Sequence, residues 1–273
     1  MLLVIDVGNT NIVLGIFKDS DVWGQWRIYT NKSMTSDEVG LLMIQLLATK
    51  GINKEEISDI IISSVVPSMD DSLQRSCLGY FSLEPYFVRP GQEEYIAVAY
   101  GIPAELGADR VVNAVAALHL YGAPAIIIDF GTATSFCVLS REGKYLGGCI
   151  FPGLQTSASA LFKAAEKLVP VKIEQPEKVI GCTTTGAIQS GFFWGFSAMV
   201  EGMVAKISDE LQDTPLVIAT GGNAHLFQAG CPVIKVFDEQ LTLKGLYLIY
   251  QNKYKGKDEY EDKDKHGGGE KPR

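Results

Sequence analysis

The sequence has few of the cysteines that would indicate a disulfide framework or a zinc site. Its five cysteines are scattered and form no C-x-x-C pair: Cys77, Cys137, Cys149, Cys182 and Cys231. An odd number of unpaired thiols is typical of small buried residues in a protein kept reduced. We therefore expect neither a disulfide framework nor a zinc site held by these cysteines. His119 and His225 lack metal-ligand spacing, and we expect them to be structural.

Long apolar runs are also missing. No stretch approaches the ~20 apolar residues that span a bilayer, and Leu2–Ile5 runs directly into Asp6, unlike a signal peptide. We expect a cytoplasmic protein with no membrane partner. The net charge of -8 argues against a nucleic-acid partner, although nucleotides need only a few local groups.

Neither a Walker A motif nor a G-x-G-x-x-G is present, so P-loop and Rossmann scaffolds lose their sequence support. The sequence does contain a repeat. Ile5–Asn11 (IDVGNTN) can be laid over Ile128–Thr134 (IDFGTAT) with an offset of 123 residues. Each copy of this motif is expected to begin a run of three strands followed by a helix. Two matched units predict an α/β protein of two similar domains that face each other across a cleft.

Apolar periodicity and turn residues predict the individual elements. Strands are expected at 2–6, 11–17, 22–29, 59–66, 85–88, 125–129, 134–139, 144–150 and 216–220, and helices at 35–51, 68–80, 109–121, 184–211 and 241–251, with a further helix starting at Gly153. The predicted domains are 1–115 and 116–251. Residues 252–273 carry seven basic and six acidic side chains and almost nothing apolar, so this tail is predicted to be disordered.

Both copies of the repeat combine groups suited to phosphate binding. An Asp ends a strand, and Gly with hydroxyl residues follows in a tight turn, whose backbone N–H groups can face an oxyanion. Two β-hairpin turns are the alternative interpretation. If both turns line one cleft, Asp6 and Asp129 bring like charges together, and cations would be needed there.

A third candidate is Gly107–Arg110 (GADR) at the start of a helix. Asp109 suits an N-cap position, but Arg110 opposes the helix dipole by ~0.3–1 kcal/mol, which indicates an anionic group opposite it. Asp109 could then accept a proton from a substrate hydroxyl. Weaker signals are the connection 147–153, which is more typical of structure than of catalysis, the three threonines 183–185 and the turn 220–223.

Together these motifs resemble the type III pantothenate kinases. The resemblance rests on DVGNT (6–10), GADR (107–110), DFGTAT (129–134), GGCIFPG (147–153) and TGG (220–222), and covers about residues 1–250. It implies the acetate-kinase/sugar-kinase/Hsp70/actin superfold, with two ribonuclease-H-like (actin-like ATPase) domains and the nucleotide between them. The implied reaction is the ATP-dependent phosphorylation of the primary hydroxyl of pantothenate, the first step of coenzyme A biosynthesis, with Mg²⁺, in a homodimer.

The resemblance also implies roles for single residues. Asp109 would be the catalytic proton acceptor, and Asp129 would hold a monovalent cation, K⁺ or NH₄⁺. ATP would be bound by Asp6, Val7, Gly8, Asn9, Thr10, Asn11, Ile12, Val13 and Thr132. Pantothenate would contact Tyr100, Gly107, Ala108, Asp109, Arg110 and Thr184, and the last of these is a candidate for a contact supplied by the partner subunit. Thr183 stands where the family usually has Asn.

Two alternatives remain open at the level of sequence. One is a kinase of the same superfold that acts on another small hydroxy acid or a sugar, although Arg110 favours an anionic acceptor. The other is a nucleotide-binding regulator without turnover. The intact set of Asp6, Asp109, Arg110 and Asp129 weighs against such a regulator, and the sequence has no visible basic helix-turn-helix.

Overall fold

The computed structural model describes residues 1–91, 95–99 and 101–266. The chain forms two compact units, one made of Met1–Arg89 with the segment from Leu243 onward, the other of Pro90–Thr242. The second unit is therefore inserted, in sequence, into the first. Among the described residues, no helix is both long and apolar enough to span a membrane.

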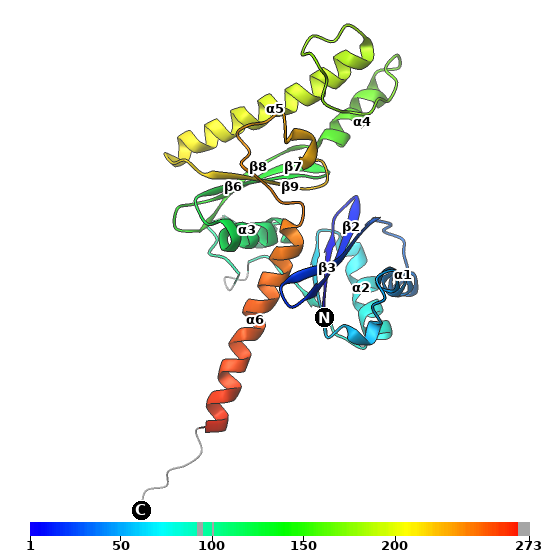
Figure 1. Cartoon of the computed structure of the whole chain (residues 1–273), viewed down its shortest axis with the longest axis vertical. Helices are drawn as coiled ribbons and strands as arrows, with labels where there is room; N and C mark the ends of the chain where they lie inside the picture. The colour runs from blue at the N-terminus through cyan, green and yellow to red at the C-terminus, as the bar shows by residue number, and fades with distance from the viewer. Residues whose placement is uncertain (92–94, 100, 267–273) are drawn as a thin grey trace, which may run out of the picture. The chain divides into compact units, whose positions relative to one another are not determined.

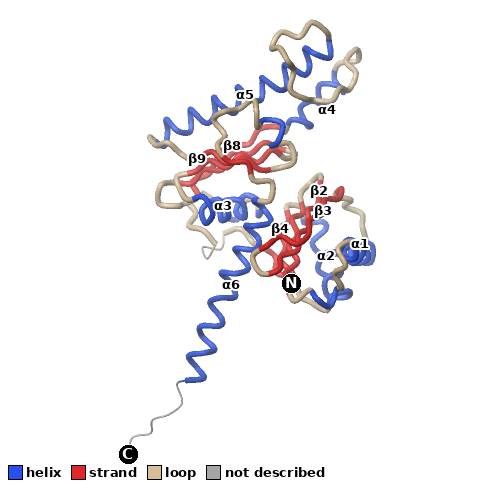
Figure 2. Tube along the Cα trace, in the orientation of Figure 1, coloured by secondary structure: helices blue, strands red, loops and turns tan. Residues whose placement is uncertain are grey.

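The first unit is a five-stranded mixed sheet covered by helices (Figures 1 and 2). Its elements are β1 (Leu2–Val7), β2 (Asn11–Lys18), β3 (Asp21–Tyr29), α1 (Ser36–Ala48), η1 (Lys54–Glu56), β4 (Asp59–Ser64), α2 (Pro67–Ser76), the π-type turn η2 (Cys77–Phe81) and β5 (Tyr86–Phe87). The strand order is β3-β2-β1-β4-β5. β1 pairs antiparallel with β2 and parallel with β4, so it lies at the centre of the sheet.

The two faces of this sheet pack against different helices. Leu3 and Ile5 share one buried cluster with apolar side chains of α1 and α2. On the opposite face lies helix α6 (Leu241–His266). A Cβ added at Gly15 would meet both Val4 and Leu243 at 3.0 Å, and the rings of Phe17 and Tyr247 stack at 4.7 Å.

The predicted start of α1 is confirmed in detail. Thr35 is the N-cap, its side chain accepts from Glu38 N, and the Glu38 carboxylate accepts from Thr35 N at 2.8 Å. This reciprocal capping box satisfies two backbone N–H groups that would otherwise lack partners at a helix start. The pattern T-x-x-E was therefore sufficient to locate this helix.

The second unit has a sheet of the same design. Its elements are η3 (Pro103–Glu105), α3 (Ala108–Tyr121), β6 (Ala125–Phe130), β7 (Ala133–Leu139), β8 (Tyr145–Pro152), α4 (Leu154–Ala164), α5 (Thr184–Leu211), β9 (Leu216–Thr220), η4 (Ala224–Phe227) and β10 (Val236–Phe237). The strand order is β10-β9-β6-β7-β8. Helices α4 and α5 share a buried cluster with one face of the sheet, and α3 packs on the other face (Figure 1).

The predicted duplication is confirmed. β1 and β6 have six residues each, start 123 positions apart, and have the same pattern of buried and half-buried residues. Asp6 lies opposite Val13 on one side and Ser63 on the other. Asp129 correspondingly lies opposite Ser135 and Thr220. Each half of the chain thus places an Asp near the end of a central strand.

One helix end differs from the sequence-based expectation. Helix α6 continues to His266 instead of ending at Gln251. Residues 252–266 contain no proline and are rich in Lys, which is a good helix former even without an apolar face. The compact units divide at Arg89 and Thr242, while the functional domain limits 1–115, 116–251 and 252–273 stay a prediction.

Candidate active site

The turn after β1 is held in a defined shape by its own backbone and by β3. Gly8 N donates to Asn11 O at 3.0 Å, which closes the turn. Thr30, just after β3, donates from its hydroxyl to Gly8 O at 2.6 Å and from its backbone N to Thr10 O at 2.9 Å. Asn9 and Thr10 are exposed at the tip. A ligand can therefore approach this turn without unfolding it.

The residues predicted to bind ATP in this turn are not equivalent. Val7 and Ile12 are buried in the core of the first unit, so only their backbone groups can face a ligand. Asp6 and Val13 are paired across β1 and β2, and both are half-buried. The side chains that can reach a ligand are thus Asp6 and those of the turn.

In the second unit, both oxygens of the Asp129 carboxylate have close neighbours. Its Oδ2 accepts a hydrogen bond from Asn113 Nδ2 at 3.4 Å. Its Oδ1 faces Gly221, which has a φ of +91° and no room for a Cβ, because that atom would contact Oδ1 directly. Only glycine combines this backbone conformation with such a close approach. The TGG turn after β9 therefore shapes the surroundings of the Asp129 carboxylate.

The neighbouring turn at Gly131 and Thr132 is fixed by the start of α4. The carbonyl of Thr132 accepts from Gly153 N at 3.0 Å and from Thr156 Oγ1 at 2.7 Å. A Cβ at Gly153 would overlap the carbonyl of Gly131. The connection 147–153 thus has a structural role, as the sequence favoured, while the Thr132 side chain stays exposed.

Asp109 is not the N-cap that the sequence predicted. The helix α3 starts one residue earlier, with Gly107 as its cap and no side-chain cap hydrogen bond. Asp109 is the second helical residue, and its Oδ1 accepts from Arg110 N at 2.8 Å. Ala108 has no side chain that competes for backbone N–H groups, so the helix can include it. The carboxylate still lies at the positive end of the helix dipole.

Burial raises the pKa of Asp109 above its ordinary value of 3.8, because desolvation disfavours the charged form. The backbone N–H of Arg110 and the Arg110 charge oppose this effect and are outweighed. A carboxylate with a raised pKa accepts a proton more readily than an ordinary one. The direction of this shift is the one that suits a general base.

Three charged residues of the predicted site, Asp109, Arg110 and Asp129, act electrostatically on one buried thiol. Burial raises the pKa of Cys137 to about 12, and the charges of all three residues act on it. The hydroxyl of Tyr145, which is fully buried, donates to Cys137 Sγ at 3.5 Å, and Arg110 also acts on this hydroxyl. The predicted catalytic, cation-binding and carboxylate-binding residues of the second unit thus all lie within electrostatic range of this one thiol.

Of the two remaining predicted substrate residues, one is not described by the structure and the other lies away from Asp109. Tyr100 falls outside the described residues, although Tyr145 pairs by backbone hydrogen bonds with its neighbours Ala97 and Ala99. Thr184 is exposed at the start of α5, a helix that packs on the sheet face opposite α3 (Figure 1). A single chain therefore does not place Thr184 beside Asp109.

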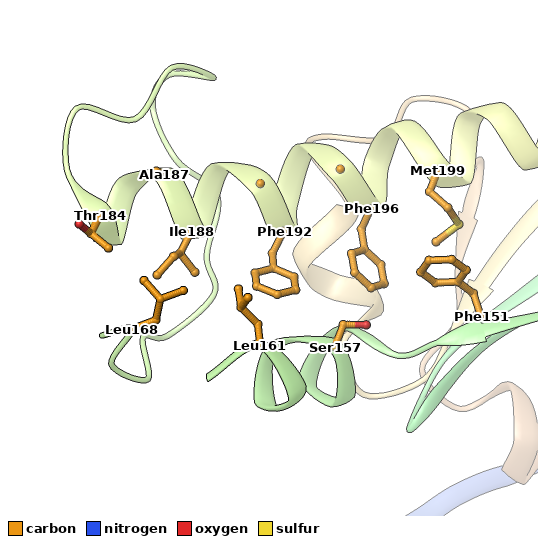
Figure 3. A pocket seen from close by; sticks show the side chains of 12 residues that line it. Phe151, Ser157, Leu161, Leu168, Thr184, Ala187, Ile188, Phe192, Phe196 and Met199 are labelled. Carbon is orange, nitrogen blue, oxygen red and sulfur yellow. The ribbon is translucent and has the colours of Figure 1, made fainter. Parts of the chain in front are cut away.

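Thr184 instead lies at one end of an apolar groove of about 700 Å³. The α5 side chains Ile188, Phe192, Phe196 and Met199 point toward α4 and β8 (Figure 3). The other lining residues are Phe151, Ser157, Leu161, Leu168, Ala187, Gly191 and Gly195. Ser157 and Thr184 are the polar residues of this otherwise apolar lining.

Within the described parts of the chain, no three His, Cys, Asp or Glu side chains gather in a cluster that could hold a metal ion. His119 Nδ1 instead contacts Val115 O of its own helix at 2.9 Å. Any cation at Asp6 or Asp129 would therefore need further ligands from a nucleotide, water or backbone carbonyls.

Known structures define the class of the fold. A protein from Campylobacter jejuni described as a Baf family transcriptional activator matches with a TM-score of 0.58 and 16% identity, over 92% of this chain and 98% of that one. The (R)-2-hydroxyglutaryl-CoA dehydratase component A of Acidaminococcus fermentans matches with 0.53 and 14%, over 92% and 98%. The activator of 2-hydroxyisocaproyl-CoA dehydratase from Clostridium difficile, solved with bound ADPNP, gives 0.50 and 12%, over 94% and 97%. The chain has the actin-like ATPase fold.

Within that fold, the sequence identifies the family. The model of the type III pantothenate kinase family matches residues 2–206, three quarters of the chain. The chain belongs to the type III pantothenate kinase family. It is a kinase that uses ATP in coenzyme A biosynthesis, and pantothenate phosphorylation is the activity that the family implies.

Some residues of this site carry no motif from which the sequence could predict them. Asn113 was not singled out, although it follows Asp109 by four positions and so lies on the same face of α3. Thr242, whose hydroxyl donates a hydrogen bond to Asn113 Oδ1, is distant in sequence and carries no motif. Gly221 was noticed only as part of a possible loop, because its contact with Asp129 depends on tertiary structure.

Proposed function

We propose that this enzyme transfers the γ-phosphoryl group of ATP to the primary hydroxyl of pantothenate, with Asp109 as the proton acceptor. The observation that carries the proposal is the placement of Asp109. Its carboxylate lies at the start of α3 beside Arg110, in surroundings that raise its pKa, and it shares these surroundings with Asp129.

In this reaction, the hydroxyl oxygen of pantothenate forms a bond to the γ-phosphorus while the bond to the β,γ-bridging oxygen breaks. The hydroxyl proton passes to Asp109, and the products are 4′-phosphopantothenate and ADP. Phosphoryl transfer through a loose transition state needs positioning and charge neutralisation more than a strong base. A well-placed carboxylate is therefore sufficient.

ATP is assigned to Asp6, the backbone of residues 7–13 and the Thr132 hydroxyl. The exposed, pre-shaped turn at Gly8 supports this assignment. Mg²⁺ commonly uses one or two carboxylates and the substrate phosphates, so the absence of a larger ligand cluster in the described part of the chain fits it. When bound, Mg²⁺ would neutralise charge on the phosphates.

Asp129 is assigned to a monovalent cation, K⁺ or NH₄⁺. The support comes from Gly221, whose backbone approaches Asp129 Oδ1 too closely to leave room for a Cβ and so places main-chain groups beside that oxygen. One carboxylate oxygen with nearby backbone groups suits a cation of single charge better than it suits zinc, which prefers nitrogen and sulfur ligands.

Pantothenate is assigned to Gly107, Ala108 and Arg110, with Arg110 opposite the pantothenate carboxylate. Arg110 supports this because a guanidinium can bind a carboxylate through two hydrogen bonds. Tyr100 is carried over on sequence alone.

We further propose that the enzyme is a homodimer whose subunits meet at the groove between α4 and α5. The groove is apolar and open, and exposed apolar patches of this kind typically mark interfaces. Because Thr184 lies at its end, a partner subunit packed there could supply Thr184 to the pantothenate site.

The proposal is tested by ADP release from the purified full chain with MgATP and pantothenate, in KCl or in NaCl of equal ionic strength. We expect turnover that requires pantothenate and is stimulated by K⁺. Turnover with another hydroxy acid or a sugar, but not with pantothenate, would identify the alternative kinase. ATP binding without turnover on any acceptor would favour a nucleotide-binding regulator.

A further inference from the structure

One side chain connects α3 to Asp129 and to the start of α6. Asn113 is 2% exposed and makes two side-chain hydrogen bonds. Its Nδ2 donates to Asp129 Oδ2 at 3.4 Å, and its Oδ1 accepts from Thr242 Oγ1 at 2.8 Å. All three residues belong to the second unit.

The direction of these hydrogen bonds is set by charge. An ionised carboxylate only accepts, so the Asn113 atom that faces Asp129 has to be the amide nitrogen. The carbonyl oxygen then faces Thr242, whose hydroxyl has to donate. The Thr242 hydroxyl thereby stabilises the amide in the orientation that the carboxylate requires, with the donor toward Asp129.

The two oxygens of the Asp129 carboxylate have different neighbours. Oδ2 faces the Asn113 amide, while Oδ1 faces Gly221. A hydrogen bond to one oxygen restricts rotation of the carboxylate and so fixes where the other oxygen points. Groups that orient a ligating side chain in this way typically change metal affinity by about ten- to a hundredfold.

We propose that Asn113, oriented by Thr242, is a positioning residue that holds Asp129 with Oδ1 directed to a monovalent cation. This inference rests on the proposed role of Asp129. It assigns Asn113 no contact with substrate. Helix α3 then carries both the proposed proton acceptor and this positioning residue, since Asp109 and Asn113 lie one helical turn apart on the same face.

The test uses three variants of the full chain and one matched control. Thr242→Val removes the hydroxyl at nearly constant shape, and Thr242→Ser keeps a hydroxyl. Asn113→Ala removes the amide. The control is Ser197→Ala, because Ser197 is also buried and donates its hydroxyl to Phe193 O at 2.9 Å, on α5 and away from Asp129.

The readout is the affinity for MgATP, measured by calorimetry in KCl and in NaCl of equal ionic strength, without pantothenate. We expect wild type to bind more tightly in KCl. In T242V and N113A, the K⁺ concentration that gives half of this gain should rise about tenfold. T242S and S197A should behave as wild type. The melting temperature of each variant reports its folding separately.

The inference is overturned if T242V and N113A keep the wild-type K⁺ dependence and differ only in melting temperature, because their role is then structural. It is also overturned if wild type binds MgATP equally in both salts. Because no acceptor is present, failure of pantothenate phosphorylation would show in the turnover assay alone and would leave this result intact.

Discussion

At the scale of single residues, Asp109 combines two demands that oppose each other. Its carboxylate is desolvated, which raises its pKa and suits a proton acceptor. The same burial of a charge disfavours the folded state. Substitution of this one side chain should therefore lower activity and raise stability, and the two effects can be measured separately.

The first prediction concerns activity. Asp109→Asn keeps the size of the side chain but cannot accept a proton, so we expect turnover to fall by about 10²–10⁴ with folding intact. Asp71→Asn is the matched control, because Asp71 is an exposed helical Asp that pairs with Arg75. Steady-state ADP release measures both. Loss of less than about tenfold in D109N would remove Asp109 from its catalytic role.

The second prediction concerns stability against pH. An acid whose pKa is higher in the folded state lowers stability as pH rises through that pKa, since the unfolded chain loses its proton first. We expect D109N to melt above wild type at pH 8, by about 2–4 °C for each kcal/mol recovered. The gap should close as pH falls toward the ordinary value of 3.8. A gap that is independent of pH would mean that charge burial is not its cause.

Residue identities in the site could be predicted only where a motif carried them. Asp109 and Asp129 stand in short patterns of glycine and hydroxyl residues, which physical chemistry links to phosphate and cation binding. Asn113 has no such pattern, and its importance appears only when Asp129 and Thr242 are placed on either side of it. Sequence reasoning also placed Asp109 at the N-cap, since it could not weigh Gly107 as an alternative cap.

At the scale of elements, the long helix α5 is apolar over a broad surface. Val200 and Val204 pack into the core of the second unit. A second stripe at 184, 187, 188, 191, 192, 195, 196 and 199 lines the groove, and its members Ile188 and Phe196 also belong to that buried core. This spacing of three and four residues is the repeat of one helix face. The exposed positions of the second stripe, 184, 187, 191 and 195, are the ones that a partner can contact.

The third prediction tests this second stripe. A Cβ at Gly195 or at Gly202 meets nothing within 4 Å, so either residue can be replaced without strain in one chain. Gly195 lines the groove and Gly202 does not. We expect Gly195→Glu to convert a dimer to a monomer and Gly202→Glu to leave it intact. Light scattering during gel filtration gives the mass of each.

Two results would contradict the proposed interface. If wild type has the mass of one chain, the homodimer proposal fails. If G195E and G202E both remain dimeric, the subunits meet elsewhere and Thr184 does not lie at the contact. Pantothenate turnover by G195E adds a functional readout, because loss of Thr184 from the partner should raise KM for pantothenate.

Most elements could be predicted because local signals agreed with the final structure. Strand β9 (Leu216–Thr220) matches its predicted limits, since it is a short apolar run bounded by turn residues. β10 was missed because Val236–Phe237 is too short to form a pattern, and it exists only through its pairing with β9. The end of α6 was missed because apolar periodicity stops before the helix does.

At the scale of the whole molecule, the chain is built from one design used twice. The two sheets have equivalent strand orders, and each places an Asp near the end of its central strand. The helices that cover the two sheets differ between the halves. The second unit has the long helix α5 on its sheet, whereas the first unit uses α6, which comes from the far end of the chain.

The final prediction tests how far the first unit depends on α6. Leu246 is fully buried in the part of α6 that belongs to that unit. We expect Leu246→Ala to reduce the free energy of unfolding by about 2–5 kcal/mol. Leu41→Ala is the control, since Leu41 lies on α1 of the same unit and is 51% exposed, and it should change stability by at most about 0.5 kcal/mol. Urea unfolding compares them, and equal midpoints would show that α6 adds no stability.

The insertion of one unit into the other has a consequence for synthesis. Protein units generally complete folding in the order in which they leave the ribosome. Here the strands of the first unit emerge first, but Leu243 and Tyr247, which cover one face of their sheet, emerge after the whole of the second unit. The half of the chain that is translated later therefore has all its packing partners first, and the half translated earlier has to wait for them with one sheet face uncovered.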